Sequence, residues 1–160
     1  MINPFGPPYR DEVQFLVIVL LAIAAWHRGG APERACAGTL LAMMVVDRLW
    51  HAVFGPTGNL GTFDWWHGAL DLGLLVAFVA IGLRANRIYP MVMAGFQLVS
   101  VNAHIVRIGV EDMAPIAYGL LYIVPSYFQI LALVVGLALH VRRERIYGRY
   151  RDWRPAASTG

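Results

Sequence analysis

The chain has 160 residues, of which 58% are hydrophobic and 14% are charged, and its formal net charge is +3. Soluble domains average about 45–50% apolar and about 25% charged residues. This composition therefore excludes a disordered chain, a nucleic-acid-binding arm and most soluble enzymes. The length suits a single domain, so we expect one transmembrane domain over residues 1–160. The single cysteine, Cys36, excludes an intrachain disulfide.

The first apolar run, Val13–Trp26, is shorter than the others. As a helix it would cover roughly 21 Å, which is less than the roughly 30 Å hydrocarbon core of a bilayer. We predict that it spans at about residues 13–27, with Tyr9 and Trp26 as interfacial anchors. The alternative is a partial or interfacial helix. A cleaved signal peptide is disfavoured because the preceding residues carry one arginine against Asp11 and Glu12.

Four longer apolar runs follow. Each is long enough to cross a membrane, and they predict spans at about 35–54, 63–83, 88–110 and 116–141. The connections between them are short and contain glycine or proline, which favours antiparallel neighbours. The sequence therefore predicts an all-α integral membrane helical bundle of five, alternatively four, transmembrane helices with short loops.

Arginine is distributed unevenly along the chain. Arg28 and Arg34 border the first connection, Arg84 and Arg87 the third, and six arginines lie in the tail 142–160. Positively charged residues are retained in the cytoplasm. We therefore expect a bacterial inner-membrane protein with a cytoplasmic tail and a periplasmic N-terminus. The loops around Pro56 and Asp112 would then lie outside.

The tail alternates arginine with Tyr147, Tyr150 and Trp153. This pattern could suit nucleic acid, but arginine next to a span attracts anionic lipid, and tyrosine and tryptophan settle at the headgroups. We expect membrane lipid as a partner and no nucleic acid. No GxxxG motif specifies a contact face, so a homo-oligomer and a larger membrane complex both stay open.

Charged and polar residues also occur inside the predicted spans, where they are rare and usually functional. They repeat at intervals of three or four, which places them on one face of each helix. All of them fall in the outer half of the bilayer under the predicted orientation. We therefore expect one outward-facing ligand-binding pocket closed below by apolar residues. Its members are Asp47, Arg48, His51, His67, Asp71, His104 and Arg107.

A metal ion is the first ligand to consider. Imidazole and carboxylate groups suit Zn or Fe, and the predicted metal ligands are His51, His67, Asp71 and His104. Neither an HExxH nor an ExxH motif supports this prediction. The alternative is a non-catalytic membrane subunit with a purely structural network, in which Arg48 and Arg107 balance the two aspartates.

Two further alternatives stay open. A haem would need two facing histidines, such as His51 or His67 with His104, and quinones favour aromatic clefts. Aspartate, histidine and arginine in one pocket are also the usual components of proton relays, which would suit transport or sensing of a small solute. No residue pattern identifies a reaction, so binding is favoured over catalysis.

Overall fold

The computed structural model describes residues 9–55, 64–110 and 114–155. In these ranges the chain forms five α-helices and no strand, with a single isolated bridge between Ala85 and Trp153. The prediction of an all-α bundle with five helices is confirmed. The helices are α1 (Arg10–Arg28), α2 (Ala31–Phe54), α3 (Trp65–Arg84), α4 (Tyr89–Gly109) and α5 (Pro115–Tyr147).

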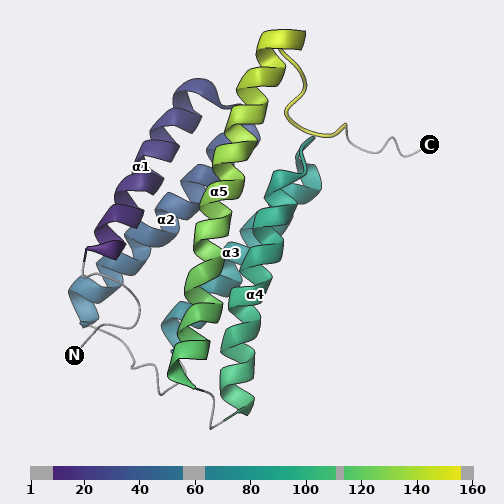
Figure 1. Cartoon of the computed structure of the whole chain (residues 1–160). Coiled ribbons are helices and arrows are strands. Elements are labelled where there is room, and N and C mark those ends of the chain that lie inside the picture. The colour runs from purple at the N-terminus through teal and green to yellow at the C-terminus, as the bar shows by residue number, and fades with distance from the viewer. Residues whose placement is uncertain (1–8, 56–63, 111–113, 156–160) are drawn as a thin grey trace.

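Consecutive helices lie side by side, and α5 closes the ring by contacting α1 and α2 as well as α4 (Figure 1). Helices α2 to α5 are each long and apolar enough to cross a membrane. Helix α1 begins three residues earlier than predicted and has 19 residues, or about 28 Å of helix. It carries Arg10, Asp11 and Glu12 in its first turn, and whether it spans stays a prediction.

Local signals explain where the helices begin. Asp64 caps α3, because its carboxylate accepts hydrogen bonds from the backbone N–H groups of Trp66 and His67. Helix α2 begins after Gly30, whose N–H donates to the Glu33 carboxylate at 3.0 Å. Gly55 ends α2 with φ 79°, a conformation that favours glycine.

The apolar core lies between the polar groups at the two ends of the bundle. Phe78, Met93 and Leu133 are its largest fully buried apolar side chains. Gly136 lets α5 approach the ring of Tyr89, since a Cβ atom at this position would lie 2.6 Å from two ring carbons. This close packing holds α4 and α5 together below the polar pocket.

The chain after α5 differs from the prediction. The helix continues six residues past 141, and the tail then folds back on the connection between α3 and α4. The N–H of Asn86 donates to the carbonyl of Asp152 at 3.0 Å, and the N–H of Arg154 donates to the carbonyl of Arg84 at 2.8 Å. The tail is therefore ordered by main-chain pairing up to residue 155.

The three arginine-rich segments meet at one end of the bundle. Arg87 Nε lies 2.9 Å from Glu33 Oε1, and Arg87 Nη2 lies 2.8 Å from Asp152 Oδ1. The first connection, the third connection and the tail therefore share one side, as the arginine distribution predicts. Which side of a membrane this is stays a prediction.

Candidate metal centre

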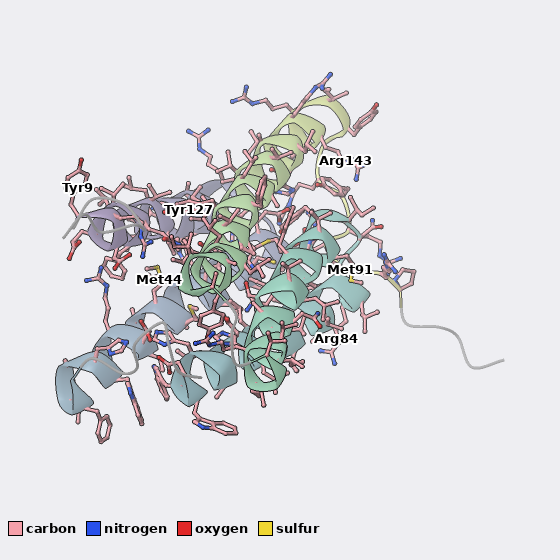
Figure 2. All side chains as sticks on the ribbon, turned by 60° about the horizontal axis from the view of Figure 1, so that its bottom comes forward. Tyr9, Met44, Arg84, Met91, Tyr127 and Arg143 are labelled. Atoms are coloured by element: carbon pink, nitrogen blue, oxygen red, sulfur yellow. The ribbon has the colours of Figure 1, made fainter. Side chains whose placement is uncertain are left out.

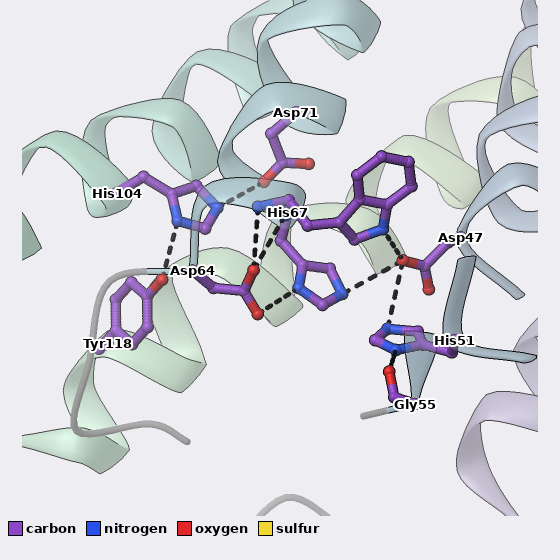
Figure 3. A network of polar contacts seen from close by, with 9 residues as sticks. Asp47, His51, Gly55, Asp64, His67, Asp71, His104 and Tyr118 are labelled. Atoms are coloured by element: carbon purple, nitrogen blue, oxygen red, sulfur yellow. Dashed lines mark hydrogen bonds and ion pairs between the residues drawn. The ribbon is translucent and has the colours of Figure 1, made fainter. Parts of the chain in front are cut away.

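At the opposite end of the bundle, Asp47, His51 and His67 converge (Figure 3). Asp47 and His51 lie one turn apart on α2, and His67 lies in the first turn of α3. Asp47 Oδ1 is 3.5 Å from Nε2 of His51 and 3.3 Å from Nε2 of His67. One ligand atom from each of the three residues falls within 4.8 Å of the other two.

Both imidazole rings are fixed from behind. His51 Nδ1 is 3.0 Å from the carbonyl oxygen of Gly55, and His67 Nδ1 is 2.7 Å from Asp64 Oδ2. Both partners are acceptors, so each Nδ1 carries a proton and donates it. Metal-binding histidines are held in the same way, by a carbonyl or carboxylate on the nitrogen that does not bind the metal.

The remaining nitrogens therefore turn toward Asp47. With Nδ1 protonated, a neutral ring presents a lone pair at Nε2, and two such lone pairs facing an anionic oxygen repel each other. A proton or a cation between them removes this repulsion. The Nε2–Oδ1 distances exceed the 2.7–3.2 Å of ordinary N–H···O hydrogen bonds. They match the roughly 3.3–3.4 Å between ligand atoms of a tetrahedral zinc site with bonds of about 2.0–2.1 Å.

Two tryptophans flank this group. Trp66 Nε1 donates to Asp47 Oδ1 at 3.0 Å, and its ring stacks on Trp50 with centroids 3.9 Å apart. The hydrogen bond fixes the carboxylate, and the stacked rings connect α2 to α3. Neither Trp66 nor Asp64 was among the predicted pocket residues. The signal for Asp64 was its position three residues before His67, at the start of an apolar run.

A second polar cluster lies deeper and is buried. Asp71 Oδ2 is 2.9 Å from His104 Nε2, and His104 Nδ1 is 2.8 Å from the hydroxyl of Tyr118 (Figure 3). In the tautomer with a proton on Nε2, the ring donates to Asp71 and accepts from Tyr118. Gln97 donates to Asp71 Oδ1 at 2.8 Å and accepts from Gln129 at 2.6 Å.

The four predicted metal ligands thus fall into two groups. His51 and His67 converge with Asp47, whereas Asp71 and His104 pair with each other. Asp71 follows His67 by one turn on α3, but its carboxylate oxygens contact His104 Nε2 and Gln97 Nε2 and not the triad. Asp47 supplies the carboxylate that Asp71 was predicted to provide.

The two predicted arginines contact groups outside the triad. Arg48 donates to the carbonyl of Asp11 at 3.1 Å and lies over the ring of Phe15. Arg107 is buried and lies over the ring of Tyr118. Asp47 and Asp71 face histidines, a different arrangement from the aspartate–arginine balance of the structural alternative.

A cavity of about 610 Å³ lies beside the triad. Five of the seven predicted pocket residues line it, namely Asp47, Arg48, His51, His67 and Asp71. His104 borders it only through its hydrogen bond to Asp71. Asp112 and the Pro56 loop, which were predicted to lie outside the membrane, fall outside the described residues.

Comparisons with protein-family models, curated proteins and solved structures give no match for this chain. Its function is therefore inferred from the chemistry of the site alone.

Proposed function

We propose that this protein is a small multi-pass membrane protein that binds one divalent transition-metal ion, with zinc preferred, through Asp47, His51 and His67. The convergence of two imidazole nitrogens on one carboxylate oxygen carries the proposal. The hydrogen bonds at both Nδ1 atoms support it, because histidines that bind a metal are held by an acceptor at the other ring nitrogen.

The donor set and spacing favour zinc. Two histidines and one carboxylate are also a common Fe(II) donor set. Octahedral sites with bonds of about 2.1–2.2 Å bring neighbouring ligands to about 3.0–3.1 Å, which is closer than the 3.3 and 3.5 Å found here. Three protein ligands leave a fourth tetrahedral position for a ligand from the cavity.

Metal content of the purified protein tests the proposal. After dialysis against a buffer that contains traces of several divalent metal ions, we expect elemental analysis to find one zinc ion per chain. Asp47→Asn and His67→Gln should lose it, and Asp64→Asn should weaken binding by about 10–100-fold. His104→Gln is the matched control, because it changes a histidine of the deeper cluster and should keep the metal. Equal zinc in all four variants would contradict the proposal.

We also propose that the cavity faces the periplasm and the tail end faces the cytoplasm. The arginines gathered at the tail end support this orientation. In a Cys36→Ala background, a membrane-impermeant thiol reagent added outside intact cells should label a cysteine at Asn59 and spare one at Tyr147. If only the Tyr147→Cys variant is labelled, the protein has the opposite orientation.

A further inference from the structure

The cavity beside the metal centre has two chemically different parts. Its polar wall contains the triad and Asp71. The rest combines polar side chains, among them Gln97, Ser100 and Gln129, with apolar side chains from α1, α2, α3 and α5. The apolar ones include Ile18, Leu40, Met43, Met44, Leu74 and Ile123. Its volume of about 610 Å³ falls in the range of small-molecule sites, about 300–1,000 Å³. A ligand that fills it needs a polar head and an apolar body.

The charges of the lining indicate which head fits. The ionisable lining groups other than the histidines are four carboxylates and two arginines, namely Asp11, Glu12, Asp47 and Asp71 with Arg10 and Arg48. A bound dication brings their sum to zero. Asp64, which holds His67 from behind, adds one more negative charge. An anionic head would therefore be repelled, whereas a neutral carbonyl oxygen can occupy the fourth position of the metal.

The seam between α1 and α5 gives such a ligand access from the side. A groove of about 270 Å³ between these helices is lined by Val13, Val17, Tyr127 and Ile130. Arg10 and Gln14 border both the groove and the cavity. A hydrogen bond from Gln14 Nε2 to Ser126 Oγ, 3.0 Å long, connects α1 to α5 where the groove meets the cavity. Figure 2 brings this end forward, with Tyr127 on the side of α5 that faces α1, and Met44 of α2 lines the cavity.

Building on the metal centre, we infer that the cavity binds one single-chain lipid with a neutral carbonyl head, such as a fatty amide or a monoacyl ester. The carbonyl oxygen takes the fourth position of the metal. The acyl chain lies along Met43, Met44 and Ile123 and enters through the α1–α5 seam.

Binding of tritiated oleamide to zinc-loaded protein in phosphatidylcholine nanodiscs tests this inference, with protein-free nanodiscs as background. We expect one saturable site per chain. Met44→Trp and Ile123→Trp should each weaken binding by roughly tenfold or more, because the added ring fills the cavity. Leu49→Trp is the matched control, since Leu49 lies on the same helix, is 61% exposed and does not line the cavity. Retained zinc shows that each variant is folded.

Unlabelled oleamide should compete at least tenfold better than oleate or octadecane, which test the charge of the head and its presence. Stoichiometric zinc without saturable oleamide binding overturns this inference and leaves the metal centre intact. Equal oleamide binding by Asp47→Asn or by chelator-treated protein also overturns it, because the carbonyl then does not need the metal. Absence of zinc from the wild-type protein overturns both proposals.

Discussion

The two ends of the bundle use charge differently. At the tail end, Arg87 lies between Glu33 and Asp152, and the Glu33 side chain is fully buried. At the cavity end, Asp47 and Asp71 face histidines, and the triad borders a cavity. A guanidinium keeps its charge and occupies its carboxylates permanently. Imidazole can exchange a proton for a metal, so the triad at the cavity end can change its occupant.

This difference indicates that the tail end stabilises the fold and the cavity end binds. Arg87 also donates to the backbone carbonyl of Asp152 and contacts Nδ1 of His140, so its hydrogen bonds are directed to groups of this protein. Around Asp47, the Nε2 atoms of two imidazoles and the indole N–H of Trp66 converge on one carboxylate oxygen. The predictions below separate the two ends, starting with the largest expected effect.

Arg87→Met should destabilise the protein most. Removing one partner of a buried ion pair costs about 3–5 kcal/mol, because Glu33 would keep an uncompensated charge in the interior. Thermal unfolding in detergent measures the loss, and zinc content should stay at the wild-type level in the fraction that folds. Arg84→Gln, which changes an exposed arginine of the same connection, is the control and should be nearly neutral.

A double variant sharpens this result. In Glu33→Met with Arg87→Met both charges are gone, and replacing a buried pair with apolar residues is often close to neutral. We expect the double variant to recover much of the stability lost by Arg87→Met. If it is as unstable as the single variant, the contacts of Arg87 with Asp152 and His140 dominate, and not the charge of Glu33.

The deeper Asp71 cluster shares a feature with each end: it is buried like the Arg87 ion pair, and its carboxylate contacts a histidine as Asp47 does. Asp71→Asn should cost about 1.5–3 kcal/mol, because it weakens the charge-assisted hydrogen bond to His104. Zinc content should be unchanged, in contrast to Asp47→Asn. Thermal unfolding and elemental analysis of the same sample measure both effects. Loss of zinc without loss of stability would place Asp71 in the metal centre, as the sequence alone predicted.

The sequence predicted some of these features because they depend only on local geometry. Asp47 and His51 are four residues apart, which places them on the same face of any helix. Apolar runs of about 20 residues identified α2 to α5, and the arginine positions identified the segments that meet around Arg87. These signals need no knowledge of how the helices pack.

The remaining features depend on register between helices, which periodicity does not encode. The prediction grouped Asp71 with His51 and His67, but the structure pairs Asp47 with His67, one turn before Asp71 on α3. The cap at Asp64 and the stacked Trp50 and Trp66 rings fix this register. The sequence also did not predict the hydrogen bond from the N–H of Ala31 to Asp152, because arginine and aromatic residues after a span are typical of a lipid-facing tail.

The smallest expected effect concerns the pH dependence of the tail end. Burial raises the pKa of Asp152, but hydrogen bonds from the N–H of Ala31 and from Arg87 outweigh it, and the pKa falls below its ordinary value of 3.8. The carboxylate is therefore more stable in the folded than in the unfolded protein. Its contribution is complete above about pH 5 and is lost as the pH falls below about 4. Because a third of the side chain is exposed, we expect less than about 1 kcal/mol.

Comparing Asp152→Asn with the wild type isolates this contribution from the other carboxylates. The variant should unfold at a lower temperature than the wild type at about pH 6, and the difference should be smaller at about pH 3, because the Asp152 carboxylate is then partly protonated. Asp11→Asn, which changes an exposed carboxylate at the cavity end, should show a smaller difference at both values. A difference that persists undiminished at about pH 3 would mean that the shape and hydrogen bonds of Asp152, and not its charge, hold the tail on Ala31 and Arg87. The tail end would then depend on main-chain pairing and not on the arginine.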